Sequence, residues 1–381
     1  MQPGLRRRLV YVVYLLTVGG AAAYAAFVVL RAFEIYRLLK TPRVGVEGRA
    51  HRADPELGWS AVPGAQAALM FPIGPSIPLR YDAESFRVPA GPTPPRRRPY
   101  VLALGCSFTH GDGIAAEETF CAVVARELGG TCLNAGQQGY GLTQVQTLAR
   151  RLIPRYRPDI VLAQYSSWLV ERGQSPFGRS SFGRLPKPFF TGVRGEQVLV
   201  QGPLFRAALF DLPFADYGGP SRSLLDFGSF LLRAGGPLLI HDDLAMGRLA
   251  WRRWRSRLPR PGGDPNAIER AVYAEIARLS EEAGSRMVVV HLSLGMDERR
   301  PRLGGLVRQG KALIADAQSA LNAQVADRTR DSYRRMFCLW RGTPPVLVDS
   351  HPNPRAHALI AETILAALAR AGVDARALAP R

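Results

Sequence analysis

Lysine is scarce in this chain of 381 residues. It occurs only at Lys40, Lys187 and Lys311, so the formal net charge of +19 comes almost entirely from arginine. The arginines are scattered among alanine, glycine and proline instead of being gathered with aromatic residues. Because nucleic-acid-binding proteins usually concentrate their basic residues in one patch, we expect no nucleic-acid partner.

Cysteine is also scarce, and four cysteines are too few to make a disulfide scaffold of a chain this long. None has the spacing of a metal site, and no glycine-rich phosphate loop is present, so we expect neither a metal nor a cofactor. Cys121 and Cys132 can pair if the domain is exported, and a free thiol is the alternative. The hydrophobic fraction of 47% permits a full core.

Residues 9–30 form an apolar run, Leu9 to Leu30, that contains no charged side chain. Such a run is long enough to cross a bilayer as a helix. The arginines at 6–8 precede it, which predicts a cytoplasmic amino terminus and an extracytoplasmic, periplasmic remainder. The basic residues Arg31, Arg37, Lys40 and Arg43, on the other side of the run, oppose that orientation. A signal peptide cleaved after Ala23-Tyr24-Ala25 is the alternative, but the apolar run continues beyond it, which favours an uncleaved membrane anchor.

A second membrane-related feature lies between Arg248 and Arg260, where arginines surround Trp251 and Trp254. This composition suits a helix in the membrane interface, with tryptophan at the depth of the headgroups. A solvated basic helix that packs its tryptophans inward is the alternative, and the sequence leaves both open. The surrounding arginines are Arg252, Arg253, Arg255 and Arg257.

The rest of the chain alternates between strand and helix patterns, which predicts an α/β protein with a parallel sheet and helices on both faces. A Gly- and Pro-rich stretch at 173–265 interrupts the alternation and is interpreted as an insertion. The predicted elements are strands at 100–104, 131–134, 160–165, 286–294 and 346–348, and helices at 117–128, 142–151, 267–282, 306–325 and 355–370.

Ser107 follows the apolar run Leu102–Leu104 at a turn of small residues, Gly105-Cys106-Ser107. A buried parallel strand that ends in this way delivers a side chain to the carboxyl edge of the sheet, where α/β proteins place their chemistry. A serine hydroxyl becomes a good nucleophile when an imidazole takes its proton and a carboxylate orients the imidazole. Asp349 and His351, near the other end of the chain, could supply both groups.

These segments resemble the SGNH (GDSL-type) hydrolase superfamily, in its bacterial membrane-anchored branch. Four blocks carry the resemblance: 105–113, which contains Ser107; 133–141, Leu-Asn-Ala-Gly-Gln-Gln-Gly-Tyr-Gly; 158–165; and 349–351. A leader at 54–87 is also similar. The resemblance implies a three-layer α/β/α sandwich of flavodoxin-like type, here preceded by one transmembrane helix.

The resemblance also implies roles for individual residues. Ser107 would be the nucleophile, His351 the base and Asp349 its orienting carboxylate, and the backbone N–H groups of Ser107 and Gly139 would form the oxyanion hole. The expected substrate is an acyl ester on a small molecule, an envelope glycan or a lipid. Hydrolysis and acyl transfer both remain open.

The chain departs from the family pattern at three places. Cys106 replaces the aspartate before the nucleophile, and Asp349 and His351 are two apart, where the family usually has three. Trp168-Leu169 occupies the place of the Asn-Asp pair, whose amide is the third oxyanion donor. Losing such a donor costs about two to three powers of ten in rate. Ser167 and the Trp168 indole N–H are the candidate replacements.

The missing donor motivates an alternative function, a catalytically inactive SGNH-like binding or assembly protein of the cell envelope. Alternatives also exist for single residues. His351 could instead cap the last helix, His110 is a rival base, and Cys106 is a rival nucleophile. We expect His291 to be a hydrogen-bonded core residue and His357 to be a structural residue inside a helix.

Together these patterns predict a linear organisation of the chain. The segments are a cytoplasmic tail at 1–8, a transmembrane anchor at 9–30, a stalk and leader at 31–97, the first half of the core at 98–172, the insertion at 173–265, and the second half of the core at 266–381.

Overall fold

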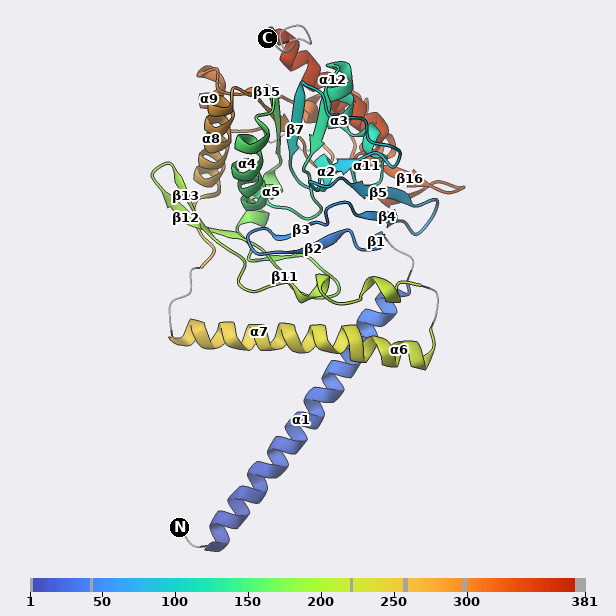
Figure 1. Cartoon of the computed structure of the whole chain (residues 1–381), viewed down its shortest axis with the longest axis vertical. Coiled ribbons are helices and arrows are strands. Elements are labelled where there is room, and N and C mark those ends of the chain that lie inside the picture. Colours follow the sequence, from blue (N-terminus) through green and yellow to red (C-terminus); the bar gives the residue numbers. More distant parts are fainter. Residues whose placement is uncertain (1–2, 42–43, 220–221, 256–259, 297–299, 374–381) are drawn as a thin grey trace. The chain divides into compact units, whose positions relative to one another are not determined.

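The computed structural model describes residues 3–41, 44–219, 222–255, 260–296 and 300–373 (Figure 1). The chain divides into two compact units. The helical unit comprises 1–41, 180–184 and 208–257, and the α/β unit comprises 42–179, 185–207 and 258–381. The segment expected as one insertion, 173–265, is therefore shared between the two units.

A parallel sheet forms the centre of the α/β unit, with the strand order β8-β7-β9-β14-β15. The side chains of β7, β9 and β14 are almost all buried because both faces are covered, which is why these strands are nearly continuous apolar runs and do not alternate. The strands predicted at 100–104, 131–134 and 160–165 are confirmed. The five strands named here are β7 (Tyr100–Leu104), β8 (Thr131–Asn134), β9 (Ile160–Tyr165), β14 (Arg286–His291) and β15 (Leu313–Ala315).

Helices cover this sheet on both faces (Figure 1). On one face α4 (Leu142–Tyr156) packs against α8 (Pro265–Ala283), and on the other α3 (Phe120–Glu127) packs against α12 (Pro354–Arg370). The α/β class with a mainly parallel central sheet is confirmed.

The leader extends the sheet on the side of β8. Its strands are antiparallel and follow the order β1-β4-β5-β6-β8. This extension is held to the parallel part by the pairing of Arg87 with Asn134. The leader strands are β1 (Gly45–Glu47), β4 (Gln66–Met70), β5 (Ile77–Tyr81) and β6 (Arg87–Val88), and a separate hairpin is made by β2 (His51–Asp54) and β3 (Gly58–Ala61).

The predicted helix at 306–325 is wrong. The segment contains α9 (Gly304–Arg308), then β15, then α10 (Ala317–Ala323). Gly310 adopts a left-handed backbone with φ +68°, which ends the helix, and Leu313–Ala315 pairs with β14. The strand predicted to reach residue 294 ends at His291.

Three further elements lie between α10 and the last helix. The sequence patterns missed α11 (Arg330–Phe337). The strand predicted at 346–348 is confirmed as β17 (Val346–Asp349), but it pairs antiparallel with β16 (Leu339–Arg341) in a separate ribbon. The carboxyl end of β17 carries Asp349 towards α12.

The middle of the chain contributes short elements to both units. In the α/β unit these are α5 (Ser167–Gly173), β10 (Phe177–Gly178), β11 (Leu185–Pro186), β12 (Phe189–Arg194) and β13 (Gln197–Gln201). In the helical unit they are the 3-10 turns η2 (Ala208–Phe210) and η3 (Ala215–Tyr217).

The helical unit is built on α1 (Pro3–Leu39). Its residues 5–39 form a helix that is long and apolar enough, by length and composition, to cross a membrane. It extends beyond residue 30, where the stalk was expected to begin. α1 packs against α6 (Leu224–Phe230), the π-helical turn η4 (Leu231–Gly235) and α7 (Gly236–Arg255).

Cys121 and Cys132 form a disulfide that joins α3 to β8. Of the two alternatives left open by the sequence, a disulfide and a free thiol, the structure has the disulfide. Cys106 and Cys338 are free and buried.

Candidate active site

Ser107 stands at the carboxyl edge of the sheet, directly after β7. It is the first residue of the short helix α2 (Ser107–His110), and Cys106 before it is extended. Gly105 permits this sharp turn, because a Cβ there would lie 2.1 Å from Thr109 Oγ1 and 2.5 Å from Gln164 Oε1. The turn therefore needs glycine for steric reasons.

Gln164, from the neighbouring strand β9, fixes the same turn by hydrogen bonds of its side chain. Its Oε1 accepts the backbone N–H of Cys106 at 3.0 Å and the hydroxyl of Thr109 at 2.8 Å. Its Nε2 lies 3.2 Å from Cys106 Sγ and 2.8 Å from Ser166 Oγ. Cys106 is completely buried, so its thiol points into this cluster and Ser107 faces the imidazole described next.

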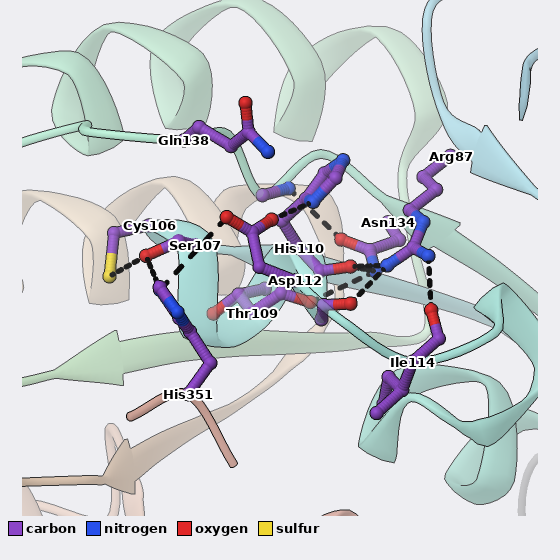
Figure 2. Close-up of polar contacts among 12 residues, drawn as sticks. Arg87, Cys106, Ser107, Thr109, His110, Asp112, Ile114, Asn134, Gln138 and His351 are labelled. Carbon is purple, nitrogen blue, oxygen red and sulfur yellow. Dashed lines mark hydrogen bonds and ion pairs between the residues drawn. The ribbon is translucent and has the colours of Figure 1, made fainter. Parts of the chain in front are cut away.

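His351 reaches Ser107 from the other end of the chain (Figure 2). Its Nε2 lies 2.8 Å from Ser107 Oγ, and its Nδ1 lies 2.7 Å from Asp349 Oδ1. The same carboxylate oxygen accepts the backbone N–H of His351 at 3.3 Å. This turn accommodates the two-residue spacing that differs from the family pattern.

The cap of the last helix is a different residue. Asn353 accepts the backbone N–H of Ala356 at 3.0 Å, and Pro354 is the first residue of α12. The side chain of His351 is thus directed to Ser107 and Asp349 rather than to the helix end.

A second carboxylate lies on the Ser107 side of the imidazole. Asp112 Oδ2 is 3.9 Å from His351 Nε2 (Figure 2). The other oxygen of Asp112 lies 2.6 Å from His110 Nδ1, and His110 Nε2 lies 2.9 Å from the Tyr81 hydroxyl. His110 is therefore engaged by Asp112 and Tyr81.

The two carboxylates control the charge of His351. Burial of the ring lowers its pKa, but the hydrogen bond of Asp349 and the negative charges of Asp112 and Asp349 outweigh burial and raise the pKa of His351 to about 9. Burial raises the pKa of Asp112, but its hydrogen bond and charge interaction with His110, together with the charge of His351, lower that pKa to about 2. Asp112 is therefore an anion near neutral pH.

Arg87 holds the loop that carries Asp112 (Figure 2). Its guanidinium donates to the carbonyls of Gly111 at 2.6 Å and Ile114 at 2.5 Å, and also to the carbonyl of His110. Arg87 is only 3% exposed. A buried cation that bonds several carbonyls of one loop fixes the loop firmly, because leaving those donors unpaired would be costly.

The loop after β8 lies against the Ser107 turn. Asn134 Nδ2 donates to the Thr109 carbonyl at 2.9 Å, and its Oδ1 accepts the N–H of Gly136 at 3.0 Å. A Cβ on Gly136 would lie 2.4 Å from His110 N, so the two loops are in close contact. Gly139, the expected oxyanion donor, follows in the same loop with φ +74°, a backbone conformation that favours glycine.

Trp168, which belongs to α5, packs against Phe108, the residue that follows Ser107. The Phe108 ring lies between two others, with its centroid 5.3 Å from that of Trp168 and 5.4 Å from that of His351. The indole Nε1 of Trp168 is buried and has no hydrogen-bond partner among the residues that the structure describes. Ser167, the other candidate replacement, begins the same helix.

His291 and His357 have structural surroundings. His291 is 1% exposed and its Nδ1 lies 2.7 Å from Asp316 Oδ1, which confirms a hydrogen-bonded core residue. His357, inside α12, accepts the backbone N–H of Phe120 at 3.1 Å and stacks on that ring, which confirms a structural role. Burial lowers the pKa of His357 to about 3.

The sequence patterns brought Ser107, Asp349 and His351 to attention but assigned no role to four residues that surround them: Arg87, Asp112, Asn134 and Gln164. All four lie inside or beside the blocks that carry the family resemblance. Asp112, a carboxylate five residues after Ser107 on the same tight turn, offered the clearest signal. Their contacts depend on tertiary folding, which spacing in the sequence does not show.

Comparisons with known proteins add similar structures. No protein-family model matches the chain, and no curated protein matches it. Solved structures similar to it include TesA, with 11% identity, coverage of 71% of this chain and 97% of TesA, and a TM-score of 0.35. A member of the lipolytic protein G-D-S-L family from Veillonella parvula DSM 2008 has 10% identity, covers 71% of this chain and 98% of its own, and has a TM-score of 0.34.

A third similar structure is a catalytic mutant of Axe2, an acetylxylan esterase from Geobacillus stearothermophilus, with 14% identity, coverage of 74% of this chain and 97% of its own, and a TM-score of 0.33. At these low identities and TM-scores we base the function on the geometry of the site in this chain.

Proposed function

We propose that this chain is a serine-dependent carboxylic ester hydrolase of the SGNH type, with Ser107 as nucleophile, His351 as base and Asp349 as the orienting carboxylate. The observation that carries the proposal is the continuous set of hydrogen bonds from Asp349 through His351 to Ser107, at 2.7 and 2.8 Å. This arrangement of acid, base and nucleophile is what activation of a serine hydroxyl requires.

The reaction begins when Ser107 Oγ attacks the ester carbonyl and its proton passes to His351 Nε2. Asp349 holds the Nδ1–H of the ring and stabilises the imidazolium. Asp112, 3.9 Å from Nε2, adds a second negative charge beside that cation. The imidazolium then gives its proton to the leaving alcohol, and the acyl group remains on Ser107.

The negative charge that develops on the carbonyl oxygen of the substrate must be stabilised by hydrogen-bond donors. We assign this role to the backbone N–H groups of Ser107 and Gly139, and the indole N–H of Trp168 is the third candidate. The buried, unpartnered state of this N–H, among the described residues, supports the assignment, since a buried donor without an acceptor is unfavourable until a ligand supplies one. Ser167 remains the alternative donor.

In the second step His351 removes a proton from water, or from a second alcohol, whose oxygen attacks the ester carbon. The bond between the acyl carbon and Ser107 Oγ then breaks, and the imidazolium returns its proton to Ser107. Water makes the enzyme an esterase, and an alcohol makes it an acyltransferase. Partition between the two is measured by adding a simple alcohol to the assay and following the transesterified product.

We further propose that α1 anchors the protein in a membrane and that the site works on the extracytoplasmic side, on an acyl ester of an envelope glycan, lipid or small molecule. The disulfide between Cys121 and Cys132 supports this side, because disulfides persist in oxidising compartments. Protease accessibility of the α/β unit in spheroplasts, in which the cytoplasmic membrane is intact, tests the orientation.

Hydrolysis of a p-nitrophenyl acyl ester by the full-length chain tests the function. Ser107→Ala should reduce kcat by about 10⁶-fold, since removing the nucleophile of such a triad has effects of this size. Ser280→Ala is the matched control, because Ser280 is also a buried serine and only bonds the Ile276 carbonyl of its own helix. A folded wild type that does not hydrolyse the ester would support the inactive binding or assembly protein instead. Equal activity of Ser107→Ala and an active wild type would remove Ser107 as the nucleophile.

A further inference from the structure

The helical segment 224–255, formed by α6, η4 and α7, buries one face. Phe230, Ala234, Leu238 and Leu239 are at most 1% exposed and pack in one cluster with α1 residues of the range 28–36. This is the ordinary behaviour of an amphipathic helix that docks on a neighbour.

The opposite face of the segment is apolar and exposed. Leu225 is 87% exposed, Leu232 77%, Leu244 58%, Trp251 54% and Trp254 76%. Large apolar side chains exposed in this number along one helix form a patch that needs a partner.

Helical periodicity places Leu225, Leu232, Leu244 and Trp251 on one face of the segment, because the segment contains the π-helical turn η4. A π turn adds about one residue to the helical repeat. In a regular α-helix of the same sequence, Leu244 and Trp251 would be rotated by about 100° from Leu225 and Leu232, since each residue turns an α-helix by this angle. The insertion thus aligns both halves of the apolar stripe, opposite the buried face.

The segment is fixed beside the end of the apolar part of α1. Asp243 accepts a hydrogen bond from the Tyr24 hydroxyl at 3.3 Å and pairs with Arg31 at 3.2 Å. At the other end of the segment, Asp226 pairs with Lys40 at 3.0 Å. Tyrosine and basic residues are typical of the level where a membrane span meets water.

The carboxyl end of α7 is basic. Trp251 and Trp254 lie with ring centroids 5.2 Å apart, and the guanidinium of Arg255 lies 4.7 Å from the centroid of Trp251. The acidic residues of α7 are engaged within the unit, Asp243 with Arg31 and Asp242 with the backbone N–H of Arg184 at 2.8 Å. Positive charge therefore dominates the exposed end, which carries Arg248, Arg252, Arg253 and Arg255; Arg257 lies outside the described residues.

We propose that segment 224–255 binds along the surface of an anionic membrane leaflet, at the carboxyl end of the α1 span, with the stripe of Leu225, Leu232, Leu244, Trp251 and Trp254 in the acyl boundary and the arginines among the lipid phosphates. Apolar area and attraction to anionic lipids both favour such binding. The exposed Trp251 and Trp254 exclude the alternative in which the tryptophans pack inward. The proposal rests on the membrane anchor proposed above and is independent of esterase activity.

Tryptophan quenching in the full-length chain tests this surface. The protein is reconstituted into nanodiscs with brominated acyl chains, made either of phosphatidylcholine alone or of phosphatidylcholine with phosphatidylglycerol. The emission of Trp251 and Trp254 is the difference between the wild type and the Trp251→Phe/Trp254→Phe variant. We expect bromine to reduce that emission about twofold in the anionic discs, and less in the neutral ones, because the helix is buried to the depth of the acyl boundary.

Two variants complete the test. Leu244→Glu should abolish the quenching, while Leu199→Glu, at a 37% exposed leucine of β13 in the α/β unit, should leave it unchanged. Absence of quenching in both discs would overturn the proposal, as would equal quenching in both. Disulfide cross-linking of two copies of the Leu244→Cys variant, together with absence of tryptophan quenching, would assign the stripe to self-association. This outcome would also overturn the membrane proposal.

Discussion

Two aspartate–histidine pairs stand at carboxyl ends of strands in the α/β unit, with the same Nδ1-to-Oδ1 distance of 2.7 Å: Asp349 with His351, and Asp316 with His291. His291 is the last residue of β14, and Asp316 caps α10. The His291 side chain is 2% exposed, whereas that of His351 is 24% exposed and touches Ser107. A hydrogen-bonded aspartate–histidine pair is therefore not enough to indicate catalysis. We attribute chemistry to the pair whose histidine side chain is partly exposed and bonds a serine hydroxyl through Nε2.

Substituting the histidines should give the largest difference in kcat between the two pairs. His351→Gln should reduce kcat for a p-nitrophenyl ester by about 10⁶-fold, because base and nucleophile act as one unit. His291→Gln should change kcat by only a few-fold but should lower Tm, because it removes a buried hydrogen bond and leaves Asp316 without it. Steady-state kinetics and thermal denaturation of the same preparations measure both. Similar losses of kcat in both variants would mean that the pairs are not different in function.

The carboxylates should separate the pairs by a smaller factor. Asp349→Asn should reduce kcat by about 10⁴-fold, since the amide favours the wrong tautomer of the imidazole. Asp316→Asn is its matched control and should retain most of the activity. The comparison uses kcat at saturating ester, and an active Asp349→Asn enzyme would require another orienting group for His351.

Trp168 sharpens the comparison at the next level, because its ring packs against Phe108, which also contacts His351. Trp168→Phe keeps a ring against Phe108 but removes the N–H, and should reduce kcat by about 10²-fold if that N–H is an oxyanion donor. KM should change little. A kcat equal to that of the wild type would assign the third donor elsewhere, with Ser167→Ala as the next variant to measure.

The smallest expected effect is a shift in the pH dependence of kcat/KM when Asp112 is substituted. The pKa of His351 is raised to about 9, so the ring is protonated and inactive as a base at lower pH, and kcat/KM should rise with pH up to that range. Asp112→Asn removes a negative charge that favours the cation, so the pKa of His351 should fall and the rise should move down by about one pH unit. Asp331→Asn, at an exposed carboxylate of α11, should not move it. A profile of Asp112→Asn that coincides with the wild type would exclude an electrostatic role for Asp112.

The comparison of the pairs also shows how much of the site could be predicted from sequence. Asp349 and His351 are two residues apart, in a block of recognisable composition. His291 and Asp316 are 25 residues apart in the chain, and no local pattern joins them. The strands at 100–104 and 160–165 were predictable, because a strand buried on both faces is a nearly continuous apolar run, whereas the strand at 131–134 was predictable from its place in the alternation of strands and helices.

Elements whose form depends on distant partners were less predictable. The segment 306–325 has helical composition, but a left-handed glycine and pairing with β14 divide it. The leader strands are short and gain their place only by pairing with the sheet. Likewise, the buried contacts of Arg87 with the loop carrying Asp112 join residues more than twenty positions apart.

The measurement that most directly tests the central claim is labelling of the full-length chain with a fluorophosphonate, which reacts only with an activated serine. We predict one labelled site, at Ser107, with labelling lost in Ser107→Ala and His351→Gln and retained in Ser280→Ala and His291→Gln. A wild-type protein that is folded but does not react, or a label that persists after Ser107→Ala, would contradict the account.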